Sequence, residues 1–373
     1  MKIANILFNQ KKSSKINRIF GVERSFIDYA QCFISRGDEV LSITNPDSAY
    51  AEELKKIGSQ LSEIAGVNRL NVFSSLKLAT IILKFRPDVI ICHSGRALFC
   101  ARLARRLFPL RRIPTIAVDH GANPKKFLKA DYVFTVGSHF SKELVKLGKK
   151  AETAFVIPNM FDVPKNFGPL VKKTFSTPIK IGSLGGVVLV KNFDKVLRAM
   201  VILRDRGIES NYVIGGVGNM EQQLLSMAKE FGLENNFKIL GWIDDKKSFF
   251  DSIDIFILPS LFETFGIVLL EAMLYSTPII TGNSWGPNEI IDQNINGLKV
   301  SRDDKNLMPK LIADAVEKLI KDEEFAKNLA ANAHQKFFEN YSAEMVGKRL
   351  GEIVSGIVEK EGNKLRIKKH TAK

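Results

Sequence analysis

The stretch of residues 253–271, IDIFILPSLFETFGIVLLE, says most about how this chain folds. Ile253–Leu258 is a short apolar run typical of a buried strand, and Gly266–Tyr275 has the apolar pattern of a helix. We expect Glu263 on the loop at the carboxyl end of that strand and Glu271 about two turns into the helix. Strands that alternate with helices in this way indicate a parallel sheet covered by helices.

The loop between this strand and this helix has the features of an anion-binding site. The backbone N–H groups near Phe265, Gly266 and Ile267 have no partner within the helix, and the positive end of the helix dipole lies there. They suit a diphosphate, while Glu263 and Glu271 can accept hydrogen bonds from sugar or ribose hydroxyls. The segment therefore favours a sugar nucleotide. The alternative is two solvated glutamates beside an ordinary strand–loop–helix unit.

Several other motifs occur in a definite order along the chain. They are GVER at 21–24, IPN at 157–159 with Asp162, GGVVLVKNFD at 185–194, GGVG at 215–218, GW at 241–242 and GPNE at 286–289. Together with the two glutamates at E-x7-E spacing, this set resembles the retaining glycosyltransferases of family 4, which have the GT-B fold. The resemblance spans residues 1 to about 350 and is specific for the family, whereas it does not identify the sugar or the acceptor.

The resemblance implies roles for particular residues. It implies that Lys191, Glu263 and His120 are catalytic. Lys191 would bind the donor diphosphate, Glu263 would contact the donor, and His120 would touch the donor sugar near the acceptor. Further donor-binding residues would be Glu271, Phe265, Gly266, Ile267, Gly185, Gly186 and Gly216, with Trp242 and Ile243 beside the nucleobase. On the acceptor side, His93 and Ser94 follow the expected strand Asp88–Cys92, and Gly21 permits close backbone approach.

One position departs from the family pattern. Gly186 stands where the family has an arginine, five residues before Lys191, so one diphosphate ligand is missing. Either another cation compensates, or the reaction is slow, or catalysis has been lost. The alternative function is therefore a non-catalytic sugar-nucleotide-binding or scaffold protein on the same fold. A nucleotide-sugar epimerase is a third candidate, for which no additional acid/base set is identifiable.

The predicted architecture is α/β, with two doubly wound Rossmann-like domains facing a cleft. Six strands are expected in the first half and five in the second. The acceptor-side domain comprises residues 1–165, to which a helix at about 343–358 returns in the family. The nucleotide-sugar domain comprises residues 166–342. Residues 359–373 are a basic tail that we expect to be disordered.

Composition fits a globular enzyme in the cytoplasm. The 373 residues are 45% hydrophobic and 25% charged, and no apolar run reaches the roughly 18 residues of a membrane span. Met1–Phe8 lacks the length and cleavage site of a signal peptide. Cys32, Cys92 and Cys100 have no metal-ligand spacing and are expected to be buried reduced thiols. No D-x-D triplet occurs, the motif that holds a divalent metal in the other main glycosyltransferase fold, so we expect no metal. No cofactor is expected beside the nucleotide-sugar substrate.

The positive charge is concentrated in the first half. Residues 1–165 contain 27 Lys and Arg against 14 Asp and Glu, a balance of +13, whereas residues 166–373 contribute +2. The excess comes mainly from Arg96, Arg102, Arg105, Arg106, Arg111, Arg112, Lys125, Lys126, Lys129, Lys142, Lys146, Lys149 and Lys150. A solvated basic face, attraction to an anionic cytoplasmic leaflet and nucleic-acid binding are the alternatives, and no nucleic-acid motif accompanies the charge.

These observations predict a peripheral protein on the inner face of the cytoplasmic membrane, held there electrostatically and reversibly. The predicted partners are a nucleotide-diphosphate sugar, a lipid-linked or saccharide acceptor of the cell envelope, and the anionic membrane surface, with no nucleic acid.

Overall fold

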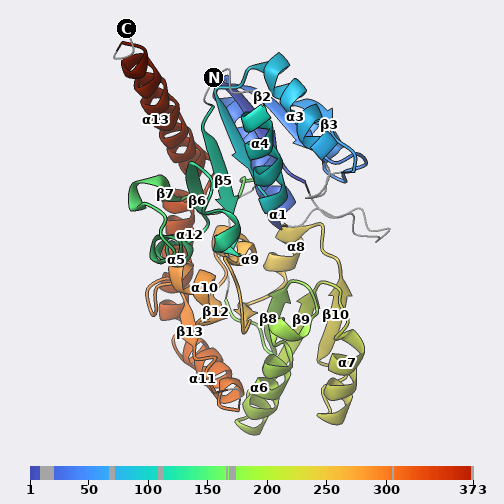
Figure 1. Cartoon of the computed structure of the whole chain (residues 1–373). Helices are drawn as coiled ribbons and strands as arrows, with labels where there is room; N and C mark the ends of the chain where they lie inside the picture. The colour runs from blue at the N-terminus through green and yellow to red at the C-terminus, as the bar shows by residue number, and fades with distance from the viewer. Residues whose placement is uncertain are drawn as a thin grey trace. The chain divides into compact units, whose positions relative to one another are not determined.

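The computed structural model describes residues 1–8, 21–66, 72–107, 113–121, 123–164, 167, 174–304 and 306–370. It contains two compact units, one formed by Met1–Asp162 with Ala343–Lys373 and the other by Val163–Ser342. Each unit is built on one parallel sheet (Figure 1). The predicted doubly wound α/β class is therefore confirmed.

The first unit has a seven-stranded sheet in the order β3-β2-β1-β4-β5-β6-β7. The strand order changes direction between β1 and β4. From β1 the chain moves outward to β2 and β3 on one side of the sheet, and from β4 it moves outward to β5, β6 and β7 on the other side. Its strands are β1 (Lys2–Ile6), β2 (Glu39–Thr44), β3 (Gln60–Glu63), β4 (Val89–Cys92), β5 (Thr115–Asp119), β6 (Tyr132–Thr135) and β7 (Ala154–Val156).

Both faces of this sheet are covered by helices. One face packs against α3 (Val72–Phe85), α4 (Gly95–Leu107) and α5 (Ser138–Lys146), through residues such as Leu78, Ala101 and Leu144. The other packs against α1 (Gly21–Ser35), α2 (Ala51–Lys56) and α13 (Ala343–His370), through residues such as Phe26 and Leu350. Alternate residues of each strand face opposite layers, so Ile3 and Ala4 belong to different apolar clusters.

The second unit has a six-stranded sheet in the order β10-β9-β8-β11-β12-β13, reversing between β8 and β11. Its strands are β8 (Ile179–Leu184), β9 (Ser210–Gly215), β10 (Phe237–Gly241), β11 (Ile255–Leu258), β12 (Ile279–Gly282) and β13 (Leu298–Val300). Its helices are α6 (Asp194–Asp205), α7 (Glu221–Glu230), α8 (Lys246–Asp251), α9 (Ile267–Leu274), α10 (Trp285–Ile290), α11 (Met308–Lys321) and α12 (Glu323–Asn340).

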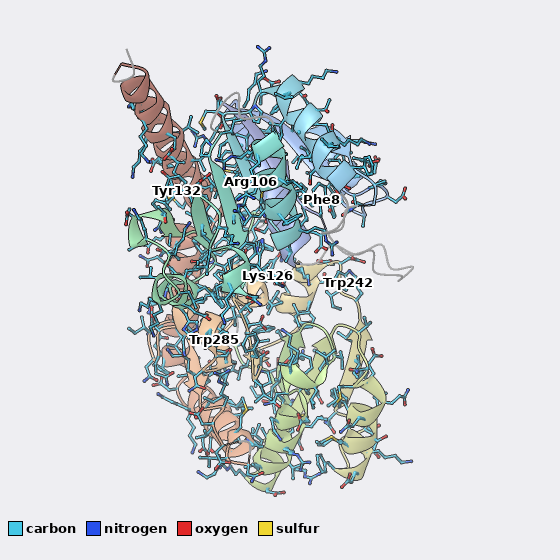
Figure 2. The ribbon with its side chains drawn as sticks, in the orientation of Figure 1. Phe8, Arg106, Lys126, Tyr132, Trp242 and Trp285 are labelled. Carbon is cyan, nitrogen blue, oxygen red and sulfur yellow. The ribbon has the colours of Figure 1, made fainter. Side chains whose placement is uncertain are left out.

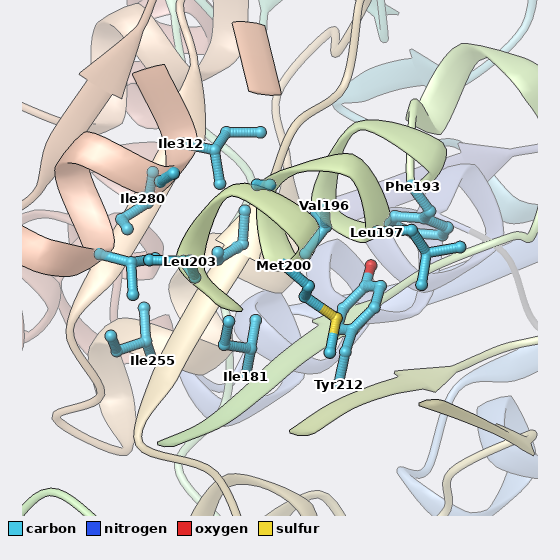
Figure 3. Packing of buried hydrophobic residues seen from close by; sticks show 14 of the residues in the cluster. Ile181, Phe193, Val196, Leu197, Met200, Leu203, Tyr212, Ile255, Ile280 and Ile312 are labelled. Atoms are coloured by element: carbon cyan, nitrogen blue, oxygen red, sulfur yellow. The ribbon is translucent and has the colours of Figure 1, made fainter. Parts of the chain in front are cut away.

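An apolar core fills the space between one face of this sheet and helices α6, α7, α11 and α12. Met200 and Leu203 of α6 lie over Ile181 and Ile255 of the strands, with Ile312 of α11 beside them (Figure 3). On the opposite face, the ring of Phe250 in α8 lies 5.5 Å from that of Phe256 in β11. The sheet is thus buried on both sides, which explains the continuous apolar runs of its strands.

The basic tail differs from its prediction. Instead of ending near Val358, α13 continues to His370. The extension has partners in its own unit, because Glu361 is buried and the Tyr132 hydroxyl donates to its carboxylate at 2.9 Å. Ile357 is also buried against the first unit's core. These contacts give the helix reasons to continue that composition does not reveal.

Several smaller expectations are wrong. The sequence-based strands omitted β3 and β13, and the helix expected from Asn192 begins at Asp194, because Asn192 adopts a left-handed backbone with φ 61°. Of the three free cysteines, Cys92 and Cys100 are buried as expected, but Cys32 is only half-buried. No helix among the residues described is long and apolar enough to cross a membrane.

Candidate functional site

The second unit gathers its predicted donor-site residues where the strand order reverses. Ligands of open α/β sheets bind beyond the carboxyl ends of the strands at such a switch point. Lys191 follows β8 and Glu263 follows β11, and their side chains form an ion pair with Nζ and Oε2 2.5 Å apart. The Leu261 N–H donates to the Val190 carbonyl oxygen at 2.9 Å, so backbone also joins the two loops.

Glycines let the loops after β8 and β9 approach closely. A Cβ on Gly216 would lie 1.8 Å from the Gly185 carbonyl oxygen, and one on Gly218 would lie 2.1 Å from that of Val187. Gly185 has φ 145°, and the Lys191 side chain lies across it, with Cε 3.5 Å from an ideal Cβ position. Only glycine fits Gly185 and Gly216 without strain, which explains the predicted glycine motifs.

Gly186 is different from its glycine neighbours. Gly186 is exposed, and its backbone φ is not in the left-handed region. An added Cβ would meet only the Val217 carbonyl oxygen, at 4.0 Å. The position therefore offers open space for a larger side chain. A second cation at this edge that sequence reasoning missed is Arg302, whose guanidinium donates to the Leu261 carbonyl oxygen. Arg302 follows β13, so only the folded sheet brings it to this loop.

The loop that enters α9 has the predicted shape. Gly266 is the residue before the helix and has φ 96°, while Ile267 is the first helical residue. Gly286 of α10 packs against Phe265 so tightly that a Cβ would lie 2.1 Å from the Phe265 carbonyl oxygen. The Gly286 N–H donates to the Glu263 carbonyl oxygen at 3.0 Å, which ties this loop to α10.

Glu271 lies one turn into α9, not two, because the helix begins at Ile267. Its carboxylate is almost fully buried and forms an ion pair with Lys246 at the start of α8, whose Nζ lies 3.6 Å from Oε2. Burial raises the pKa of Glu271, and the Lys246 charge acts in the opposite direction. Sequence reasoning missed Lys246. A signal was present, because Asp245 directly before it is a typical N-cap residue, and its carboxylate accepts a hydrogen bond from the Ser248 N–H at 3.0 Å.

The residues expected near the nucleobase lie at the edge formed by β9 and β10. Trp242 is half exposed, and its indole N–H donates to the Asp244 carboxylate at 2.8 Å. The Ile243 side chain packs over Gly215, where a Cβ would lie 2.5 Å from Ile243 Cγ1. The Gly216 N–H donates to the Gly241 carbonyl oxygen at 2.6 Å, so both loops share one border.

In the first unit, two histidines predicted at the site lie together. His93 follows β4 and His120 follows β5, and their rings stack with centroids 5.6 Å apart. Burial lowers the pKa of His120 to about 4 and that of His93 well below its ordinary value, so both are neutral near pH 7. The strands β4 and β5 are neighbours, which places the two residues side by side at the carboxyl edge.

The remaining acceptor-side residues have structural partners. The Ser94 hydroxyl donates to the Phe8 carbonyl oxygen at 3.1 Å and accepts from the Ala97 N–H at 3.2 Å, so it caps α4. Gly21 is exposed at the first position of α1. Phe20, which the sequence marks as a departure before Gly21, lies outside the described residues.

Within the described ranges, no group of three or more His, Cys, Asp or Glu side chains could hold a metal ion. Two cations, Lys191 and Arg302, contact the loops at the carboxyl ends of β8 and β11.

Comparison with known proteins yields two family matches. The family described as Glycosyl transferases group 1 matches residues 170–336, and Glycosyltransferase Family 4 matches residues 19–164. The match to residues 19–164 ends two residues after the division between the two units at Asp162 and Val163, so each match corresponds closely to one unit.

Individual proteins show the same relationship at low identity. The uncharacterized glycosyltransferase MJ1607 of Methanocaldococcus jannaschii is 32% identical over 167 residues, which is 44% of this chain and 42% of that protein. The lipopolysaccharide core biosynthesis glycosyltransferase LpsE of Rhizobium meliloti is 24% identical over 331 residues, 87% of this chain and 93% of that protein. The crystal structure of Anabaena HepE in complex with UDP has a TM-score of 0.77 at 19% identity, covering 95% and 100% of the two chains, which shows a shared fold.

Proposed function

We propose that this chain, whose two halves match glycosyltransferase family models, transfers a sugar from a nucleotide-diphosphate donor to an acceptor hydroxyl with retention of configuration. The observation that carries this proposal is the Lys191–Glu263 pair, 2.5 Å apart over Gly185 at the strand-order switch of the second unit. A cation and a carboxylate held together at one edge match a ligand that has both a diphosphate and sugar hydroxyls.

The donor would occupy the loops at this edge. Lys191 and the N–H groups at the start of α9 would face the diphosphate, and Glu263 would accept hydrogen bonds from the sugar. The buried Glu271 would accept from the ribose hydroxyls, with the base beside Trp242 and Ile243. HepE was solved with UDP, so UDP-sugars are the first donors to test.

Transfer would break the bond between the anomeric carbon and the diphosphate oxygen and form one to the acceptor oxygen on the same face of the sugar. The acceptor proton would pass to the departing diphosphate. Negative charge grows on that diphosphate, so a fixed cation stabilises the transition state more than the ground state. Lys191 would supply this cation, and Arg302 is the candidate for a second one in place of the missing arginine at Gly186. We propose that no metal takes part, since the chain has no D-x-D triplet.

The first unit would bind the acceptor. His120 is neutral near pH 7 and only half-buried, so it can exchange hydrogen bonds with a hydroxyl without adding charge, whereas His93 is buried and stacks on its ring. Relatives such as LpsE are named for lipopolysaccharide core biosynthesis, which favours a cell-envelope lipid or saccharide as acceptor. The +13 balance of residues 1–165 supports a place at the anionic inner face of the cytoplasmic membrane.

Gly186 favours a second candidate, a sugar-nucleotide-binding protein without catalysis. The exposed, open position leaves the diphosphate one cation short of the family pattern. Such a protein would bind donors and release them unchanged.

A thermal-shift screen of nucleotide sugars followed by turnover assays tests both candidates. A donor at 100 times its Kd should stabilise the protein by about 2.7 kcal/mol, which a melting curve resolves. The proposal expects the stabilising donor to be hydrolysed or transferred. Stabilisation without turnover would favour the non-catalytic candidate, and the absence of stabilisation by any nucleotide sugar would contradict both.

A further inference from the structure

The outer surface of α3 and α4 exposes several large apolar side chains close together. On α3, Phe73 is 80% exposed, and Leu76 and Leu83 are exposed along the same side of the helix. The spacing of three, seven and ten residues places them on one stripe, while Leu78, Ala79 and Ile82 face the sheet. The neighbouring α4 adds Phe99, which is 40% exposed. Large apolar groups gathered on one face usually mark a contact surface.

The charges on this surface all have one sign. Neither α3 nor α4 contains an aspartate or a glutamate. Lys77 and Lys84 lie on the exposed side of α3, and Arg96, Arg102 and Arg106 lie on the outer side of α4, where Figure 2 labels Arg106. None of these five cations forms an ion pair with any residue that the structure describes. We define this set of four apolar and five basic residues as the α3–α4 face.

Other basic residues predicted to share this surface behave differently. Arg105 turns inward, where its guanidinium lies 2.5 Å from the Asp131 carboxylate and also donates to Thr115. Arg111 and Arg112 lie outside the described residues. The basic part of the face is therefore defined by side chains that form no ion pair with the part of the chain that the structure describes, and not by the total charge of the region.

We propose that the α3–α4 face docks on an anionic lipid bilayer, with Phe73 inserted among the headgroups. A surface that joins exposed aromatic and leucine side chains to lysines and arginines lies in the interface of anionic membranes. The long stems of Lys and Arg cover apolar surface while their charges reach lipid phosphates. This deepens the membrane attachment advanced under the proposed function, because attachment becomes apolar as well as electrostatic.

Other occupants fit the face less well. A symmetric contact with a second copy would bring the same five cations against each other, which like-charge repulsion opposes. Nucleic acid would match the charge, but it would leave Phe73, Leu76 and Leu83 without apolar partners, and the chain has no known binding motif for it. An anionic bilayer offers both phosphates and hydrocarbon within one surface.

Co-sedimentation with vesicles tests the proposal. The full chain should bind phosphatidylcholine vesicles that contain about one-third phosphatidylglycerol and should bind pure phosphatidylcholine weakly. Phe73→Ser should weaken binding on the order of tenfold, from the apolar burial lost. Lys77→Gln should weaken it about fivefold, the effect of one basic residue near the surface.

Matched controls come from the second unit. Leu225→Ser removes an apolar group that is 43% exposed on α7, and Lys238→Gln removes one exposed charge from β10. Both should change vesicle binding by less than about twofold, because their sites lie outside the α3–α4 face. Equal losses in these controls would overturn the proposal, as would a wild-type chain that ignores anionic vesicles or a Phe73→Ser chain that binds as well as wild type.

Two further measurements separate the proposal from its rivals. Vesicles with brominated lipids should quench the tryptophan fluorescence of the Phe73→Trp variant more strongly than that of the wild type. Equal quenching of the two proteins would contradict insertion of residue 73. Sedimentation equilibrium of Phe73→Ser should match that of the wild type. A dimer lost in this variant with vesicle binding intact would instead support a second copy as the occupant. Donor-induced thermal shifts should be unchanged in Phe73→Ser, so failure of the membrane proposal is distinguishable from failure of the glycosyltransferase proposal.

Discussion

Replacing Gly186 by arginine should increase turnover of the nucleotide-sugar donor. The residue is exposed, its backbone is not left-handed, and an added Cβ meets only the Val217 carbonyl oxygen, at 4.0 Å. An arginine can therefore be accommodated without displacing the loop. Its guanidinium would stand on the same loop as Lys191, at the edge where we propose that the diphosphate departs.

The magnitude follows from charge and side-chain entropy. A unit charge about 4 Å from the developing charge contributes roughly 4 kcal/mol at an effective dielectric constant of about 20. Ordering the arginine side chain costs about 2 kcal/mol. The difference of roughly 2 kcal/mol corresponds to about a thirtyfold increase in kcat. Donor affinity should rise less, because the charge grows only as the bond to the diphosphate breaks.

The assay is release of nucleoside diphosphate under donor saturation, with two control variants. Gly186→Gln adds a side chain of similar length without charge and should leave kcat near that of the wild type. Gly185→Ala should lower kcat, because φ is 145° there and a residue with a Cβ is strained in that backbone conformation. A folded Gly186→Arg variant with lower activity would refute this reasoning, and would point to Arg302 as the cation already serving the diphosphate.

Three other changes have definite expected outcomes. Glu271→Ala should weaken donor binding by about 1.5–3 kcal/mol in calorimetry, the contribution of a charged hydrogen-bond partner, and unchanged affinity would remove Glu271 from the site. The charge of Lys246 lowers the pKa of Glu271, which burial raises, so Lys246→Met should let Glu271 take up a proton at a higher pH. Donor affinity should then be lost at a higher pH when the solution is acidified. An identical pH profile would show that the ion pair is not functional. Glu271→Gln should raise the melting temperature of the free protein near pH 7. Because burial raises the pKa of Glu271 in the folded state, the carboxylate makes the protein less stable as the pH rises through that pKa. The neutral amide of glutamine avoids this loss of stability. A lower melting temperature of the variant would contradict the reasoning.

Much of this architecture could be predicted from the sequence because the strands are buried on both faces. The apolar runs at β1, β4, β8 and β11 identify central strands without any knowledge of their partners. The strands β3 and β13 could not be found in this way. β3 is a four-residue strand, QLSE, at the sheet border with no fully buried residue, and β13 has only three residues.

The candidate site was predictable where residues lie close to strand ends and not where distant segments meet. Lys191 and Glu263 follow strands that are neighbours in the folded sheet, and motif spacing was sufficient to select both. Lys246 and Arg302 reach Glu271 and Leu261 only through helix and sheet packing, which local patterns do not encode. The length of α13 depends in the same way on a long-range partner, Tyr132.

Proton NMR of the first sugar released from the donor tests the central claim most directly. The stabilising nucleotide sugar would be incubated with the full chain, and the anomeric proton followed before the free sugar mutarotates, with Lys191→Ala as the inactive control. We predict that the product first appears with the anomeric configuration of the donor. Initial release with the opposite configuration would contradict a retaining transferase, and no release beyond that of Lys191→Ala would contradict catalysis by this site.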